Sequence, residues 1–227
     1  MKSTTAKALP NWPMKRRICS CVMPREEIVK PVLRVFLLSV LIGLGVALVG
    51  GFAYTRLRPY AFHGSVIQSQ NPAPDFTLQG ADGPVSLRDF RGKTVLLFFG
   101  YSFCPDVCPT TMSDLAKTMS LLGRQADRYQ VIMVSVDPER DTPEKIDAYA
   151  KHFDERFLGL SGSPEDVAQV ATLYGIYYQK QEGTAASGYL VDHTATVMVI
   201  DRKGYLRLLL PFGTAPEDIA ADLQHIR

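Results

Sequence analysis

Two cysteines carry the side chains in this sequence best suited to redox or metal chemistry. Cys104 and Cys108 directly follow a short apolar run and precede a helical pattern. A strand over residues 95–99 is followed by a helical pattern over 110–122, and Pro109 suits the first position of that helix. Both thiols would then lie at the positive end of the helix. That position favours the thiolate, which attacks disulfides and binds soft metals.

The elements around this pair predict an α/β domain. Apolar runs, turn signals and proline-marked helix starts give the order β–α–β–α, another helix, then β–β–α, which is typical of a thioredoxin-like fold. An N-terminal hairpin precedes these elements, and a polar stretch is expected to form a protruding hairpin insertion. The expected strands cover 131–136, 157–160, 194–200 and 205–210, the helices 143–153, 164–174 and 216–227, and the hairpins 75–87 and 177–189. The loop after the first core strand, where this fold carries its active cysteines, is where Cys104 and Cys108 fall.

The spacing of the cysteines distinguishes between functions. Dithiol oxidoreductases of this fold use Cys-x-x-Cys, whereas three residues separate Cys104 from Cys108. The wider spacing permits a disulfide and also lets two thiolates face one metal ion. Thioredoxins place a cis-proline just before the strand that here covers 194–200, but this sequence has His193 at that point. Two thiolates with one imidazole suit copper and favour copper(I). The alternative is that His193 is an ordinary capping or core residue.

Length and charge limit the possible functions. The 227 residues suffice for one domain with appendages. Residues 1–34 carry eight basic and two acidic side chains, whereas residues 35–227 carry seventeen basic and twenty-one acidic ones. A mildly acidic body without a basic stripe gives no support for nucleic-acid binding.

An uncharged segment follows the basic tail. Residues 35–55 contain no charged side chain, and twenty-one helical residues span about 30 Å, the thickness of a bilayer core. A buried core helix and a cleaved signal peptide are the alternatives, but the apolar stretch exceeds a signal core and lacks an obvious cleavage site. We predict a cytoplasmic basic tail over 1–31, a transmembrane anchor over 32–55, a linker over 56–74 and an exported copper-binding domain over 75–227. The basic residues before the anchor predict a cytoplasmic N-terminus.

Three further residues with metal-binding side chains lie outside the expected domain. Cys19 and Cys21 form a Cys-x-Cys pair that could bind a soft metal, although two incidental thiols in a reduced tail are the simpler interpretation. His63 lies alone in the expected linker, where a solvated loop residue is the simpler interpretation.

Three motifs resemble those of the Sco/SenC proteins, which include those called PrrC. They are Cys104-Pro-Asp-Val-Cys-Pro109, Ser135-Val-Asp-Pro-Glu-Arg-Asp-Thr-Pro143 and Asp192-His-Thr194. They occur in the family's order, after the family's usual anchor and linker. The resemblance covers roughly residues 70–227.

The resemblance implies a membrane-tethered metallochaperone that helps to assemble the binuclear copper (CuA) site of cytochrome c oxidase. Cys104, Cys108 and His193 would bind one copper ion, as Cu(I) or Cu(II), and the two cysteines would also form a redox-active disulfide. Asp106 and Asp137 would support the site or dock a partner, although Asp137 could simply cap its turn. The implied partners are the oxidase subunit with the CuA site, a thioredoxin-like reductant and an upstream copper chaperone. The domain would lie in the periplasm, held to the inner membrane by one helix.

Two other functions remain open from the residues alone. A thiol–disulfide oxidoreductase that reduces the oxidase's copper-site cysteines would need Cys104 and Cys108 but not His193. A redox or copper sensor that signals through the membrane is the third hypothesis.

Overall fold

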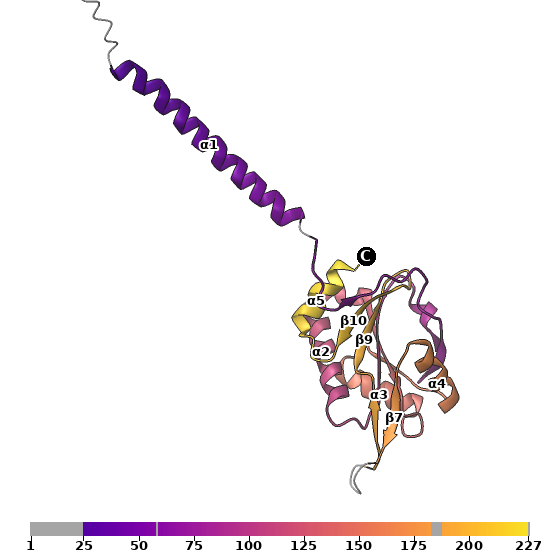
Figure 1. The fold of residues 1–227 in the computed structure, drawn as a ribbon. Helices are drawn as coiled ribbons and strands as arrows, with labels where there is room; N and C mark the ends of the chain where they lie inside the picture. The colour runs from indigo at the N-terminus through magenta and orange to yellow at the C-terminus, as the bar shows by residue number, and fades with distance from the viewer. Residues whose placement is uncertain (1–24, 58, 183–187, 227) are drawn as a thin grey trace, which may run out of the picture. The chain divides into compact units, whose positions relative to one another are not determined.

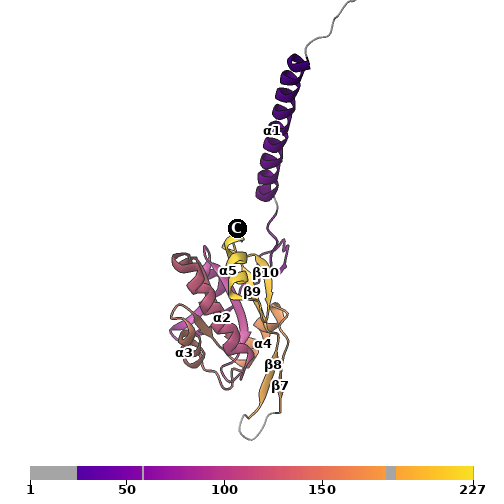
Figure 2. The ribbon, with the colours of Figure 1, turned by 90° about the vertical axis from the view of Figure 1, so that its left-hand side faces the viewer.

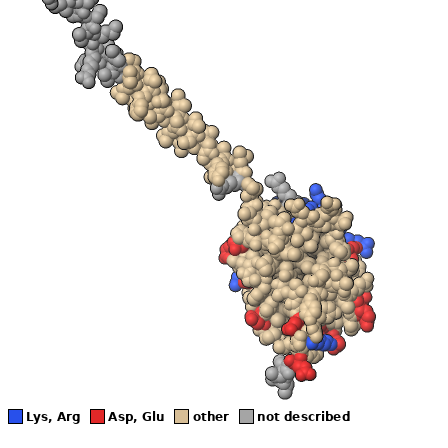
Figure 3. All heavy atoms as spheres, in the orientation of Figure 1, with Lys and Arg blue, Asp and Glu red and all other residues tan. Residues whose placement is uncertain are grey.

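The computed structural model describes residues 25–57, 59–182 and 188–226, which fall into two units, Met1–Pro59 and Tyr60–Arg227. The described part of the first unit is one helix, α1 (Arg25–Leu57), with Pro31 near its start. Its stretch Lys30–Thr55 is long and apolar enough to cross a membrane. Figure 3 shows no charged side chain on the visible face of the coloured part of α1, whereas acidic and basic side chains lie around the edge of the visible face of the second unit.

A six-stranded sheet forms the centre of the second unit, with strand order β1-β10-β9-β4-β5-β6. Strands β4, β5 and β6 run parallel, whereas β9 runs antiparallel to both β4 and β10. The strands are β1 (Ser65–Val66), β4 (Thr94–Gly100), β5 (Tyr129–Ser135), β6 (Leu158–Leu160), β9 (Thr196–Ile200) and β10 (Leu206–Pro211). Every residue of β4 is buried, because helices cover both faces of the sheet at its centre.

Helices α2, α3 and α5 lie on one face of this sheet and α4 lies on the other (Figures 1 and 2). Both right-handed crossovers, β4–α2–β5 and β5–α3–β6, advance in the same direction across the sheet, so α2 and α3 share a face. The helices are α2 (Val107–Leu122), α3 (Pro143–Phe153), α4 (Pro164–Leu173) and α5 (Pro216–His225), with 3₁₀ turns at Leu87–Phe90 and Gly123–Arg128.

Two hairpins complete the unit. The predicted N-terminal hairpin is β2 (Thr77–Gly80) paired with β3 (Gly83–Ser86). A hairpin insertion is present, with β7 (Tyr178–Gln181) paired with β8 (Leu190–His193), and it protrudes beyond the sheet in Figures 1 and 2. The predicted range of 177–189 is too short, because β8 lies entirely beyond it.

The segment that leads into the second unit is not a free linker. Within the predicted linker over 56–74, β1 pairs with β10, and the backbone N–H of Ala73 donates to the carbonyl of Gly204. Tyr60 and His63 bind Asp222 of α5, with the Tyr60 hydroxyl 2.8 Å from Asp222 Oδ1. From Tyr60 onward the chain is therefore part of the folded unit.

Candidate metal centre

Strand β4 and helix α2 position the two cysteines. The strand ends at Gly100, and the helix begins at Val107 with Cys108 buried in its first turn and Cys104 half-buried in the preceding loop. The prediction that the helix begins with Pro109 at its first position is wrong, since Pro109 lies third. Proline is tolerated there because the N–H groups of a first turn have no partner within the helix.

A fully buried carboxylate fastens the cysteine loop to the rest of the domain. Asp141, which follows β5, accepts hydrogen bonds from the backbone N–H of Ser102 at 2.9 Å and from the Ser102 hydroxyl. The Ser135 hydroxyl, at the end of β5, donates to the same carboxylate at 2.8 Å. Asp141 belongs to the Ser135–Pro143 motif, but its bond to Ser102 was not predicted, because no local pattern connects residues thirty-nine positions apart.

Strand β8 carries the histidine of the site. His193 is the last residue of β8, and β9 begins only at Thr196, so the prediction of a strand starting directly after the histidine is wrong. Its Nδ1 lies 3.2 Å from the carbonyl oxygen of Thr194. Because a carbonyl can only accept, Nδ1 carries the proton and Nε2 presents its lone pair. Nε2 lies 3.3 Å from Cys108 Sγ.

The three predicted ligand residues meet in one place. One sulfur from each of Cys104 and Cys108 and one ring nitrogen of His193 all lie within 4.8 Å of one another. Zinc binds sulfur at about 2.3 Å and imidazole nitrogen at about 2.0 Å, so two such donors on one ion lie no more than about 4.3 Å apart. The 3.3 Å between Cys108 Sγ and His193 Nε2 satisfies that limit.

The two thiols differ sharply in acidity. The pKa of Cys104 is lowered to about 3, chiefly because the Cys108 thiol donates to its sulfur, and backbone N–H groups that donate to the same sulfur lower it further. One of these is the N–H of Cys108 in the first turn of α2, 3.4 Å from Cys104 Sγ. The pKa of Cys108 is raised, because its thiol donates to Cys104 and because it is buried. The pair therefore holds one thiolate, on the more accessible sulfur.

The absence of a side chain at Gly100 makes room for the buried thiol. A Cβ atom on Gly100 would lie 2.9 Å from Cys108 Sγ and 2.8 Å from a ring carbon of Phe98. On the open side, Cys104 and His193 border a hollow of about 350 Å³, so a partner can reach these two ligands, whereas Cys108 is buried behind them. The hollow is lined by Tyr101, Cys104, Pro105, Asp106, Val107, Leu190, Val191, Asp192, His193 and Ala195.

The two aspartates expected near the site have different surroundings. Asp106 is exposed at the start of α2, on the rim of the hollow. Asp137 is fully buried, accepts hydrogen bonds from Arg140 and from the Tyr189 hydroxyl, and cannot touch a docking partner. The docking role is therefore excluded for Asp137, whereas a supporting role is compatible with its contacts.

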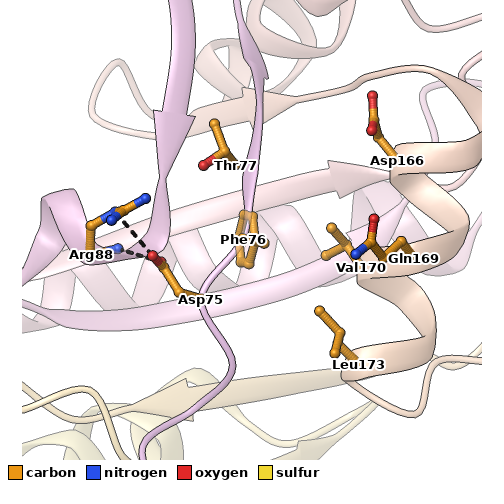
Figure 4. Close-up of a pocket in the computed structure, with 8 residues that line it drawn as sticks. All are labelled: Asp75, Phe76, Thr77, Arg88, Asp166, Gln169, Val170 and Leu173. Carbon is orange, nitrogen blue, oxygen red and sulfur yellow. Dashed lines mark hydrogen bonds and ion pairs between the residues drawn. The ribbon is translucent and has the colours of Figure 1, made fainter.

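The other candidates lie elsewhere. Cys19 and Cys21 fall outside the described residues. His63 is not a free loop residue, because Asp222 and Asp218 both contact its ring. A second hollow, of about 250 Å³, lies between α4 and the start of the N-terminal hairpin (Figure 4). Phe76, Val170, Leu173 and the Asp75–Arg88 ion pair are among its lining groups, a set that does not suit a soft metal.

Comparison with known proteins identifies the family. The SCO1/SenC family model matches residues 65–227, which is most of the chain. This chain belongs to the SCO1/SenC family. The resemblance noted in the sequence is thereby confirmed.

Individual relatives agree with this assignment. The mitochondrial SCO2 homolog of Bos taurus is 37% identical over 133 residues, which cover 57% of this chain and about half, 50%, of the bovine protein. The apo Sco1 structure from Thermus thermophilus is 48% identical, with a TM-score of 0.66 over 73% of this chain and 96% of that one. Bradyrhizobium japonicum ScoI, solved with copper bound, is 38% identical, with a TM-score of 0.63 over 69% of this chain and 100% of that one. The predicted thioredoxin-like α/β fold is also confirmed.

Proposed function

We propose that this Sco protein is a membrane-tethered metallochaperone that carries one copper ion on Cys104, Cys108 and His193. The observation that carries the proposal is the convergence of two sulfurs and one imidazole nitrogen within 4.8 Å. Two soft ligands with one imidazole favour copper(I). That Bradyrhizobium japonicum ScoI was solved with copper bound supports the same cargo here.

The destination we propose is the CuA site of cytochrome c oxidase. Ligand exchange with the acceptor's cysteines would move the ion, and the hollow beside Cys104 leaves room for an acceptor to begin coordination. A thioredoxin-like reductant would keep both thiols reduced in an oxidising compartment, and an upstream chaperone would supply the copper. We place α1 across the inner membrane, with the basic N-terminus in the cytoplasm and the domain in the periplasm.

A copper(I) titration tests the proposed ligands. We expect the reduced full-length chain, in detergent under anaerobic conditions, to bind one copper(I) ion tightly. His193→Ala should bind the ion at least about tenfold more weakly, because a two-thiolate site loses its third donor, whereas His152→Ala, on the exposed face of α3, should bind like the parent. Equal binding by the parent and His193→Ala would show that His193 is not a ligand.

The unequal acidity of the thiols favours thiol–disulfide exchange as a second function. The Cys104 thiolate would attack an acceptor disulfide, and its sulfur would form a mixed disulfide as one acceptor thiolate leaves. Cys108 would then give up its proton and attack Cys104, which leaves a Cys104–Cys108 disulfide and an acceptor dithiol with two more electrons. His193→Ala should retain this activity, because neither step uses the imidazole, whereas copper delivery should be lost. A sensor role remains the third hypothesis, without a specific contact to support it.

A further inference from the structure

The metal ligands lie on two separate segments of the domain. Cys104 and Cys108 follow β4 of the central sheet, whereas His193 lies on β8, which pairs with β7 in a separate two-stranded sheet. Isolated two-stranded hairpins are marginally stable in water. The position of His193 therefore depends on what fastens this hairpin to the domain.

A continuous chain of polar contacts joins the two segments. It begins at Ser102, whose hydroxyl and backbone N–H both donate to Asp141. The Ser135 hydroxyl donates to Asp141 at 2.8 Å and accepts from the backbone N–H of Asp137 at 3.1 Å. The Asp137 carboxylate then accepts from the hydroxyl of Tyr189 at 2.5 Å, directly before β8. Ser135, Asp137 and Asp141 are buried, so the hydrogen bonds among these three residues form out of contact with water, whereas Ser102 and Tyr189 at the two ends are partly exposed.

Arg140 reinforces the same junction. Its Nε donates to Asp137, and its Nη1 donates to the backbone carbonyl of Tyr189 at 3.0 Å. Its guanidinium carbon lies 3.7 Å from the ring centre of Tyr189 and 4.7 Å from that of Phe103, the residue before Cys104. One side chain thus contacts both the cysteine loop and the histidine hairpin.

We propose that Asp137, Arg140 and Tyr189 form a clamp that positions His193 against the two thiols. Asp137 supplies a buried acceptor, Tyr189 brings the hairpin to it, and Arg140 holds the pair together. None of the three is a ligand. Asp137 and Arg140 belong to the Ser135–Pro143 motif. The motif therefore contributes to the metal centre by positioning His193, although no side chain of the motif binds the ion. The effect of the clamp on copper affinity rests on the proposed function, whereas its effect on the position of the β7–β8 hairpin does not.

Tyr189→Phe is the sharpest variant, because it removes one hydroxyl and keeps the ring beneath Arg140. Tyr177→Phe is the matched control, since it makes the same change on an exposed side chain of the same insertion, where the hydroxyl bonds only to Gln179 in the hydrogen bonds described. The first measurement uses the reduced, metal-free full-length chain and follows amide hydrogen exchange. We expect faster exchange over residues 190–193 in Tyr189→Phe, with β4 unchanged, and parent-like exchange in Tyr177→Phe. Unchanged exchange at 190–193 would overturn the clamp.

The second measurement uses the copper-loaded full-length chain. We expect Tyr189→Phe to weaken copper(I) binding by about 10- to 100-fold and to weaken the imidazole nitrogen coupling in the electron paramagnetic resonance spectrum of the copper(II) form. Added to His193→Ala, Tyr189→Phe should have no further effect on affinity, because the clamp acts through the histidine. Parent-like affinity and nitrogen coupling, or additive losses in the double variant, would overturn the clamp. If the parent itself binds no copper, the proposed function fails, and the exchange measurement alone decides the clamp.

Discussion

At the scale of single residues, the metal centre is an unequal pair of thiols. The hydrogen bond from Cys108 lowers the pKa of Cys104 to about 3, so Cys104 is ionised at every pH where the protein would work. Cys108, in contrast, stays protonated because it is buried and donates that bond. Both metal binding and disulfide exchange need a thiolate, and the two therefore begin at the same sulfur.

This inequality predicts how the thiols react with an alkylating agent. Cys104 in the reduced, metal-free protein should react with iodoacetamide at a rate that changes little between about pH 5 and pH 8, because its thiolate fraction is constant there. Cys108→Ala removes the main cause of the low pKa, so the rate at Cys104 should then rise with pH. Peptide mass spectrometry would measure both rates. A parent rate that climbs tenfold per pH unit would contradict the assignment.

At the scale of elements, the sequence predicts best where the signal is local. Thr142 and Ser163 accept hydrogen bonds from the third residue of α3 and α4, and proline follows each, so both helices start where predicted. The strands of the histidine hairpin were harder to predict, since Tyr178–Gln181 is polar and its strand pairing has no apolar alternation. The residues around Tyr189 do not predict its hydrogen bond to Asp137, because Asp137 lies fifty-two positions earlier in the sequence.

The junction between the incoming segment and α5 predicts a pH dependence. The pKa of His63 is raised, first by its hydrogen bond to Asp222 and also by Asp218. Burial would raise the pKa of Asp222, but bonds from Gly64, His63 and Tyr60 outweigh it and keep the carboxylate ionised. A histidine whose folded-state pKa lies above about 6.5 stabilises the fold fully below that pH, and this contribution is lost as the pH rises through the folded-state value.

The melting temperature can measure this contribution. We expect the parent to melt at a higher temperature than His63→Asn, with a larger difference in melting temperature at pH 6 than at pH 8. His152→Asn is the control, because His152 is exposed on α3 and away from this junction. If the parent and His63→Asn differ in melting temperature by the same amount at both pH values, the charge on His63 does not stabilise the junction.

At the scale of the whole molecule, composition predicts the division into a helical segment and a folded domain, but not where the domain begins. The prediction was residue 75, since the preceding stretch is polar and broken by prolines. The packing begins at Tyr60 because its partner, Asp222, lies 162 positions later in the chain. The local sequence pattern around Tyr60 cannot predict a contact with a residue so far away in the chain.

Two truncated chains would locate the boundary. A chain that starts at Asp75 loses every hydrogen bond to Asp222 described above, all of them from Tyr60, His63 and Gly64, as well as the pairing of β1 with β10. Residues 60–74 also cover the Asp222 carboxylate, so the cost is that of the lost hydrogen bonds to a charged group, about 1.5–3 kcal/mol each. Urea denaturation should therefore find the 75–227 chain less stable by at least about 3 kcal/mol than the 60–227 chain. Equal stability of the 60–227 and 75–227 chains would mean that residues 60–74 are a linker after all.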